Sequence, residues 1–271
     1  LCNAAKHFSI HQKNEPITLH TSDEFGDLAG ALNIIAEDLN NFDDYQRAFI
    51  SNISHDFRSP LTSIHGYAQA MLDGTIPYEA QEKYLNIILS ETDRLTNLTS
   101  NLLELNSFNG DNVLLDITTF NICETIVQTV NTLEGTAAKK EISFVLDYNT
   151  QKELLVEADE SKIHQVLYNL IDNAVKFSHN NSEIKISLRK KGAKVFVSVK
   201  DSGIGIPKES LNKVFDRFYK TDISRGKDKR GTGLGLSISK EIIQAHNQTI
   251  NVVSTVDVGT EFVFTLKYHS K

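Results

Sequence analysis

The sequence predicts an α+β protein in which a long helical hairpin precedes an α/β domain. Apolar residues recur at steps of three and four from Leu28 to Leu105, as in long amphipathic helices. The turn residues at 109–111 then end this pattern. From about residue 112 strand-like and helix-like segments alternate, which is typical of an α/β unit.

Composition narrows the class of protein. The chain has 271 residues, 40% of them hydrophobic, and a net charge of −7, which fits a globular protein of about two domains. The mild acidic charge argues against a nucleic-acid partner, because such proteins usually present a basic face. Cys2 and Cys123 are the two cysteines, and their wide separation favours a reducing compartment and excludes a disulfide framework.

No segment approaches the roughly 18 consecutive apolar residues of a membrane-spanning helix. Because the chain begins with Leu1 and not with methionine, we expect a fragment of a longer protein. A membrane anchor in the upstream part is compatible with this expectation.

The first long helix is predicted by one apolar stripe. Its members are Leu28, Leu32, Ile35, Leu39, Phe42, Phe49, Ile53, Phe57, Leu61, Ile64, Ala68 and Met71. Most steps alternate between three and four residues, as in the seam of a coiled coil or helical bundle. Between Phe49 and Leu61 every step is four, so the packing is expected to shift there.

A turn around Asp73-Gly74 and Pro77 precedes the second helix. Its stripe consists of Leu85, Ile88, Thr92, Leu95, Leu98, Leu102 and Leu105. One hairpin cannot cover a stripe of this length. We therefore expect two copies of the chain to pair into a dimeric four-helix bundle.

The α/β part begins with Asn121 and Glu124, a helix-start pair that leads a helix to about Lys139. The later elements are expected in this order: strands at 142–146 and 154–157, a helix capped by Asp159 and ending near Val175, a hairpin of strands 184–188 and 195–199, a loop with one short helix over 201–232, a helix over 234–245, and a strand pair at 250–254 and 261–266.

Two glycine clusters are candidates for a binding site. D-S-G-I-G-I-P at 201–207 follows a strand, where Gly203 and Gly205 allow a tight turn close to a ligand and Asp201 can accept a hydrogen bond. R-G-T-G-L-G-L-S at 230–237 opens a helix and leaves backbone N–H groups for phosphates. Each cluster alone is more often a simple turn or cap. Neither is a P-loop, and the hairpin pairing disfavours a dinucleotide fold.

Polar side chains share one face of the helix that follows Asp159. Asn169, Asn173 and Lys176 stand three or four residues apart in Q-V-L-Y-N-L-I-D-N-A-V-K-F-S. Helix interiors disfavour asparagine, so two on one face indicate a site, although solvent-facing asparagines are the plain alternative. A carboxamide oxygen suits Mg²⁺, and Lys176 can meet a phosphate as a point charge.

In their order and spacing, N-L-I-D-N-A-V-K-F, D-S-G-I-G-I-P, F-D-R-F-Y and G-T-G-L-G-L-S resemble the N, G1, F and G2 boxes of the GHKL ATP-binding family. Sensor histidine kinases, gyrase B-type subunits, heat-shock chaperones and mismatch-repair ATPases share this fold. The resemblance covers about residues 112–268. It implies an α/β sandwich of the Bergerat type with ATP held between helix and loop.

The resemblance also implies roles for single residues. Asp201 would accept a hydrogen bond from the adenine amino group, and Asn173 would ligate Mg²⁺ with Asn169 beside it. Phe215 and Phe218 fit the box that packs and orders a mobile lid over the phosphates. The implied ATP-binding set is Asn169, Asn173, Lys176, Asp201, Gly203, Gly205, Phe218, Gly231, Thr232, Gly233, Leu234 and Gly235.

Among these relatives only the kinases carry a histidine box such as F-I-S-N-I-S-H-D-F-R-S-P-L-T-S-I at 49–64. It resembles their dimerisation and phosphoacceptor hairpin over about residues 46–108. At about 100° per residue, Ile53 and Phe57 set the direction of the buried stripe and His55 points almost opposite to it. A core histidine would lie on the stripe; a plain surface histidine is the remaining alternative from this helix alone.

An exposed imidazole can attack the γ-phosphate if its other N–H is held or deprotonated. Asp56 is placed to act as general base and resembles the family's acidic residue, although most members have the longer Glu. Ser59 keeps a hydroxyl where the family uses Thr or Asn to orient water for a phosphatase reaction. Pro60 leaves the carbonyl of Asp56 without its helical partner, so a bend is expected.

The resemblance therefore implies the cytoplasmic part of a homodimeric bacterial membrane receptor. Residues 1–45 would be a partial HAMP linker or coiled coil, because D-E-F-G-D-L-A-G-A-L-N resembles the second HAMP helix; 46–110 would be the phosphotransfer hairpin and 111–271 the ATP-binding domain. Such a kinase autophosphorylates on histidine from Mg-ATP and passes the phosphoryl group to an aspartate of a response regulator.

Two rivals come from other classes. One is a signalling scaffold that binds nucleotide without phosphorylating, which the intact His55, Asn173 and glycine loops disfavour. The other is a nucleotide-driven clamp of the gyrase or chaperone type, which the histidine box and the absence of a long transducer domain disfavour.

Overall fold

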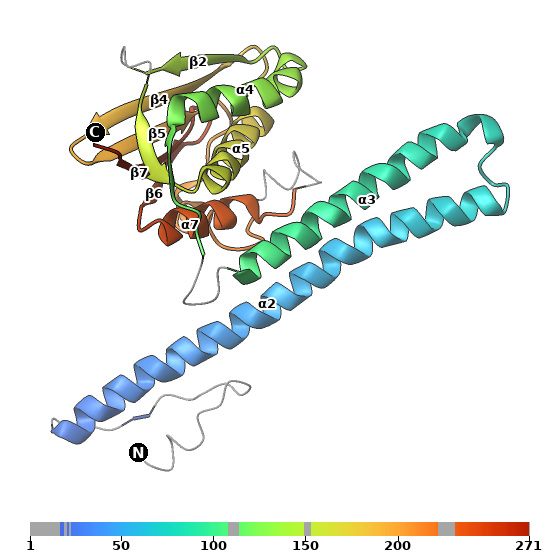
Figure 1. The fold of residues 1–271 in the computed structure, drawn as a ribbon. Coiled ribbons are helices and arrows are strands. Elements are labelled where there is room, and N and C mark those ends of the chain that lie inside the picture. The colour runs from blue at the N-terminus through green and yellow to red at the C-terminus, as the bar shows by residue number, and fades with distance from the viewer. Residues whose placement is uncertain are drawn as a thin grey trace. The chain divides into compact units, whose positions relative to one another are not determined.

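The computed structural model describes residues 17–18, 21, 23–107, 114–148, 153–221 and 231–270. It confirms the predicted fold class, a helical hairpin followed by an α/β domain (Figure 1). The chain divides into two compact units between Thr92 and Asp93. Residues 1–16 of the expected partial HAMP linker and the break expected at 109–111 lie outside the described residues.

The first helix of the hairpin, α2, runs without interruption from Glu24 to Leu72. Asp23 caps its start, because its side chain accepts a hydrogen bond from the backbone N–H of Gly26 at 3.2 Å. Pro60 lies inside this helix. Figure 1 shows no sharp kink along α2, so the missing hydrogen bond at the proline does not break the helix.

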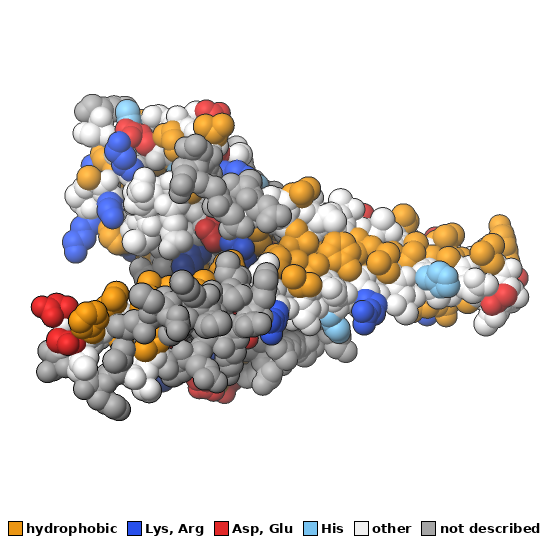
Figure 2. All heavy atoms as spheres, turned by 90° about the horizontal axis from the view of Figure 1, so that it is seen from below, with side chains coloured by type: hydrophobic (Ala, Val, Ile, Leu, Met, Phe, Trp, Pro, Cys, Tyr) orange, Lys and Arg blue, Asp and Glu red, His pale blue; other side chains and the backbone are white. Residues whose placement is uncertain are grey.

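The second helix, α3, extends from Tyr78 to Ser107. Near the connecting loop, Tyr67 of α2 packs on Tyr84 of α3 with ring centroids 5.1 Å apart, which holds the two helices together. Large apolar side chains remain exposed along the hairpin, among them Ile50, Leu61, Leu72, Leu85 and Leu89. Figure 2 shows hydrophobic side chains gathered along it. A single hairpin therefore leaves part of its apolar stripe uncovered.

No helix in the described ranges has both the length and the apolar character needed to cross a bilayer.

Within the described ranges, the α/β domain is built on a seven-stranded sheet. Its strands are β1 (Thr118–Asn121), β2 (Ser143–Asp147), β3 (Leu155–Ala158), β4 (Glu183–Lys191), β5 (Lys194–Lys200), β6 (Ile250–Thr255) and β7 (Gly259–Tyr268). The order is β1-β3-β7-β5-β4-β2, and β6 pairs with β7. The β2–β4 pair is parallel and the others are antiparallel. All but the short strand β1 were predicted from the sequence.

Helices α4 (Ile122–Ala138), α5 (Glu160–Phe177) and α7 (Gly235–Ala245) cover one face of this sheet (Figure 1). Both predicted helix starts are confirmed. The side chain of Asn121 accepts from the N–H of Cys123 at 3.3 Å and donates to Glu124 at 2.8 Å. Asp159 accepts from the N–H of Lys162 at 3.1 Å. The core lies between the helices and the sheet, where Ile163, Leu167 and Phe264 are fully buried.

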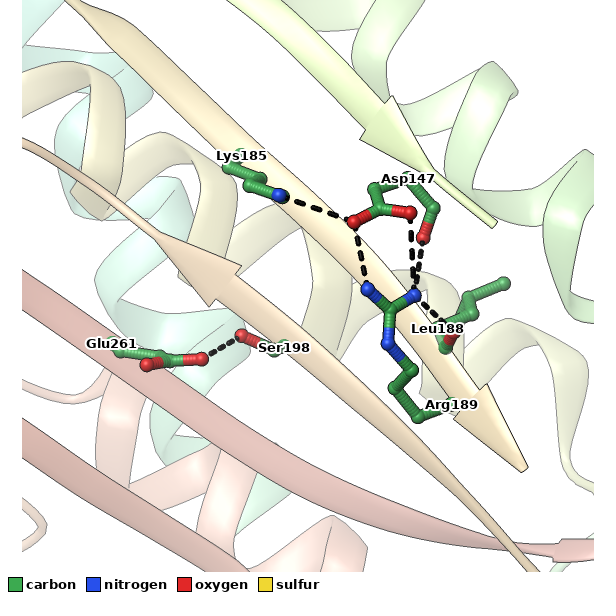
Figure 3. A network of polar contacts seen from close by, with 6 residues as sticks. All are labelled: Asp147, Lys185, Leu188, Arg189, Ser198 and Glu261. Atoms are coloured by element: carbon green, nitrogen blue, oxygen red, sulfur yellow. Dashed lines mark hydrogen bonds and ion pairs between the residues drawn. The ribbon is translucent and has the colours of Figure 1, made fainter. Parts of the chain in front are cut away.

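The opposite face of the sheet carries polar pairs (Figure 3). Along β4 the buried Ile184, Ile186 and Leu188 alternate with outward side chains. Asp147 at the end of β2 lies 3.1 Å from Lys185 and 2.7 Å from Arg189 of β4. The hydrogen bonds from Arg189 and Lys185 hold the pKa of Asp147 well below its usual range. These contacts fasten the edge strand β2 to the rest of the sheet.

Candidate active site

One cavity of about 720 Å³ in the second unit brings the three predicted motifs together, and Asn97 and Asn101 of α3 also line it. Its volume is in the range of small-molecule sites. Nine predicted residues line it: Asn169, Asn173, Lys176, Asp201, Gly205, Gly231, Thr232, Gly233 and Gly235. Gly203, Phe218 and Leu234 belong to the same motifs but are not among its lining residues.

Asp201 stands at the end of β5 with only 6% of its surface exposed. Its Oδ1 accepts hydrogen bonds from the backbone N–H groups of Gly203 at 2.9 Å and Thr260 at 3.2 Å. Burial raises the pKa of Asp201 above its ordinary value, although these two N–H groups act in the opposite direction. No hydrogen bond from a described residue reaches Oδ2. This second oxygen can therefore accept a hydrogen bond from a ligand.

The glycines after Asp201 are required because other backbone segments pack closely against them. A Cβ on Gly203 would lie 2.3 Å from the carbonyl oxygen of Phe177, and a Cβ on Gly205 would lie 2.1 Å from that of Thr255. Gly205 also has a positive φ of 66°, which favours glycine. From the sequence, we expected these glycines to let the backbone approach a ligand. The structure instead shows the loop packed against the end of α5 and against β6.

The three polar residues on one face of α5 have different surroundings. Asn169 donates from Nδ2 to the carbonyl of Gly235 at 3.1 Å and to Ser239 Oγ at 3.4 Å, so it ties α5 to the start of α7. Lys176 lies 2.7 Å from Asp172. Asn173 lines the cavity, and within the described ranges its carboxamide makes no hydrogen bond. The carboxamide of Asn173 is therefore available to bind a ligand in this cavity.

The loop before α7 presents backbone groups. Among the described residues, no side chain caps the start of α7 at Leu234, so N–H groups of its first turn are suited to bind an anion. Phe218 has a positive φ of 63°, which is strained for a bulky residue. Its N–H donates to the carbonyl of Gly233 at 3.0 Å. Phe218 therefore shapes the glycine loop. Residues 222–230 of the lid segment lie outside the described residues.

Thr260 is a site residue that the sequence reasoning missed. It lines the cavity and holds Asp201 through its backbone N–H. The preceding Gly259 is needed here, because a Cβ on it would lie 2.0 Å from the carbonyl oxygen of Asp201. The local signal for this contact is a glycine followed by a polar residue at the start of a strand.

His55 lies on α2 with its side chain 84% exposed. Ile53 and Phe57 are half-buried, as the predicted stripe requires. His55 Nδ1 lies 3.5 Å from Asp56 Oδ1, and the Asp56 side chain is 23% exposed. This distance exceeds a normal hydrogen bond, so Asp56 is adjacent to the imidazole without being bound to it. Ser59 is exposed and Pro60 is buried.

Family models match two stretches of the chain. Residues 45–110 match the His Kinase A (phospho-acceptor) domain. Residues 158–270 match the family of histidine kinase-, DNA gyrase B- and HSP90-like ATPases. These two matches define a phospho-acceptor hairpin and an ATPase-type domain on one chain.

Curated relatives and solved structures agree with this class. The sensor histidine kinase WalK of Bacillus subtilis (strain 168) is 34% identical over 252 residues, which cover 90% of this chain and 41% of the relative. The sensor protein kinase WalK of Staphylococcus aureus is 35% identical over 226 residues, 82% of this chain and 53% of the relative. The chain thus spans about half of these relatives or less.

The structure of histidine kinase ThkA in complex with response regulator protein TrrA aligns with a TM-score of 0.67 at 32% identity, covering 82% of this chain and 61% of that chain. The catalytic domain of ThkA aligns with a TM-score of 0.50 at 36% identity, covering 56% of this chain and 95% of that domain. The chain belongs to the sensor histidine kinase family.

Proposed function

We propose that this chain is the catalytic part of a homodimeric sensor histidine kinase, which phosphorylates His55 from ATP and passes the phosphoryl group to an aspartate of a response regulator. The observation that carries the proposal is a solvent-exposed histidine in a phospho-acceptor hairpin, on the same chain as the cavity of the ATPase-type domain. ThkA, a relative solved with a response regulator, supports the choice of partner.

In the proposed site, Asp201 Oδ2 accepts a hydrogen bond from the adenine amino group. Its other oxygen is held by Gly203 and Thr260, so the carboxylate is fixed before the nucleotide arrives. The glycine loop and the uncapped start of α7 receive the phosphates. Lys176 contributes a positive charge at the same cavity.

The residues fit a magnesium ion that arrives with the nucleotide. Asn173 offers an uncommitted carboxamide oxygen at the cavity, and the described ranges hold no cluster of three His, Cys, Asp or Glu that would form an all-protein site. Mg²⁺ suits one protein ligand combined with phosphate oxygens and water. When bound, the ion supplies neutralisation of the charge that develops on the phosphates.

Transfer to His55 follows from the chemistry of imidazole. A lone pair on one ring nitrogen attacks the γ-phosphorus, the bond from phosphorus to the β–γ bridging oxygen breaks, and ADP leaves. The proton on the other ring nitrogen passes to Asp56, which must approach closer than the present 3.5 Å to accept it. The long exposed side of α2 leaves His55 accessible for this attack and for the later transfer to a regulator.

Dimerisation, regulation and phosphatase activity are parts of the same proposal. The apolar side chains left exposed on the hairpin support pairing of two copies. α2 is one helix from the HAMP-like segment to His55, which supports transmission of a signal from a membrane receptor to the cytoplasmic histidine. Ser59 stands one helical turn after His55, where its hydroxyl can orient water for phosphatase activity.

Incubation with Mg²⁺ and ATP labelled at the γ-phosphate tests the proposal. We expect label on the protein that is lost in acid and stable in base, that requires Mg²⁺, and that does not appear when ATP is labelled at the α-phosphate. A protein that binds ATP but takes up no γ-label would instead be a nucleotide-binding scaffold.

A further inference from the structure

The C-terminal end of α5 is capped by a side chain from a distant segment. Lys140 lies in the turn between α4 and β2, and its Nζ donates to the carbonyl of Val175 at 2.8 Å and to that of Lys176 at 2.6 Å. The last carbonyls of a helix have no partner within the helix and carry a partial negative charge. One ammonium group therefore satisfies two of them.

The main chain of Lys140 binds the same region. Its carbonyl accepts a hydrogen bond at 3.0 Å from the N–H of Asn181, which follows α5 and has a positive φ of 57°. Side chain and main chain of one residue thus contact the last turn of α5 and the segment after it. Lys140 is half-buried, so these contacts are shielded from water in part.

The end of α5 is in turn joined to the loop that carries Asp201. The carbonyl of Phe177, directly after the two carbonyls that Lys140 binds, accepts from the N–H of Ile204 at 3.3 Å. Gly203 approaches the same carbonyl so closely that it has no room for a Cβ, and its N–H donates to Asp201 at 2.9 Å. A displacement of the end of α5 would move this loop with it.

We propose that Lys140 is a positioning residue for the nucleotide: it fixes the last turn of α5 and thereby holds Phe177 and the Asp201 loop in the arrangement that receives the adenine. It is absent from the residues that line the cavity and acts through the last turn of α5 and the Asp201 loop that this turn holds. This inference rests on the proposed binding of ATP in that cavity.

Three variants separate positioning from general stability. Lys140→Met keeps the length of the side chain and removes both hydrogen bonds, whereas Lys140→Arg keeps the charge and the donors. Lys139→Met is the matched control, because Lys139 is the exposed neighbour in the same turn. The measurements are the Kd for ADP by calorimetry and the KM and kcat of autophosphorylation, each below the melting temperature of the variant.

For Lys140→Met we expect a Kd for ADP and a KM for ATP raised about tenfold, the effect of losing roughly one strong hydrogen bond's contribution to affinity. kcat is expected to stay within about twofold, because the reacting groups are unchanged. Lys140→Arg and Lys139→Met are expected to bind ADP like the native protein.

Native affinity in a folded Lys140→Met protein would overturn the proposal, as would equal losses in the Lys139→Met control. If the methionine variant does not fold, Lys140→Gln, which can donate to one carbonyl, must show an intermediate loss of ADP affinity; an unchanged Kd there counts against the proposal. Failure of the native protein to bind ADP would refute the proposed function itself, so the two failures are distinguishable.

Discussion

Asp201 shows how one buried side chain can be prepared for a ligand. Its Oδ1 is occupied by two backbone N–H groups, and burial raises its pKa. Since the charged form is costly to bury, the carboxylate gains from a further donor at Oδ2. The adenine amino group is the donor that the proposed function supplies.

Asp201→Asn is therefore expected to keep the fold and lose nucleotide affinity. The amide oxygen can still accept hydrogen bonds from the N–H groups of Gly203 and Thr260. The new NH₂ group, however, replaces the acceptor Oδ2 by a donor, which cannot form a hydrogen bond with the amino group of adenine. An unsatisfied buried donor costs about 1–3 kcal/mol, so we expect ADP to bind roughly 10- to 100-fold more weakly. Calorimetry measures this. Unchanged affinity with a native melting temperature would contradict the assignment of Asp201.

Gly205 and Gly192 allow the cost of a positive φ to be separated from the cost of a steric clash. Both have positive φ values, 66° and 62°, but a Cβ on Gly205 would clash with Thr255 whereas Gly192 has open space around its Cβ position. We expect Gly192→Ala to cost about 1–2 kcal/mol in free energy of unfolding, from conformation alone. Gly205→Ala should cost about 3–5 kcal/mol, because overpacking is added. Urea unfolding measures both, and equal costs would show that the close contact is unimportant.

At the scale of elements, α5 is fixed at both ends. Asp159 caps its start through Lys162 and also accepts from Ser161 at 2.8 Å and from the N–H of Asp116 at 3.1 Å. Burial alone would raise the pKa of Asp159, but these hydrogen bonds outweigh it and leave the pKa below its ordinary value of 3.8. The ionised form is thus favoured by folding, and the charge stabilises the native state.

The sign of this pKa shift predicts a pH dependence. The stabilisation is fully present above the unfolded value of 3.8 and is lost as pH falls through the lower folded value. Asp159→Asn keeps a good cap but no charge. We expect the variant to be less stable than the native protein by about 0.5–1 kcal/mol at pH 6. In urea unfolding this gap should close below the folded pKa; a gap independent of pH would refute the role of the charge.

Elements with a local signature were predictable. The helix caps Asn121 and Asp159 are recognisable from the residues next to them. The strands are recognisable from their alternating pattern, and the hairpin from its apolar stripe. The four-residue strand β1 does not, because it is fixed by pairing with β3, 40 residues away at Thr118 and Ala158. In the site, asparagines and glycines indicated the cavity. Thr260 and Lys140 were missed because their contacts join positions far apart in sequence and leave no local pattern.

At the scale of the whole molecule, the exposed apolar stripe of the hairpin predicts a dimer. Leu85 is 49% exposed in the single chain, so pairing can bury about half of this side chain, which contributes about 1 kcal/mol per copy. Because a dimer contains two copies, we expect Leu85→Lys to raise the dimer dissociation constant by roughly 30-fold. The exposed neighbour Asn86→Lys adds the same charge off the stripe and should leave the dimer intact. Sedimentation equilibrium measures both; a native protein that is monomeric at micromolar concentration would refute pairing.

His55 on α2 is the proposed phosphoryl acceptor, and His65 on the same helix serves as a control. His55 and His65 are both exposed histidines, and only His55 is proposed to accept the phosphoryl group. The most direct measurement compares uptake of γ-label from Mg-ATP by the native protein, His55→Gln and His65→Gln, with ADP affinity measured in each. We predict acid-labile label on the native protein and on His65→Gln, and none on His55→Gln at unchanged ADP affinity. Label retained by His55→Gln would contradict the account.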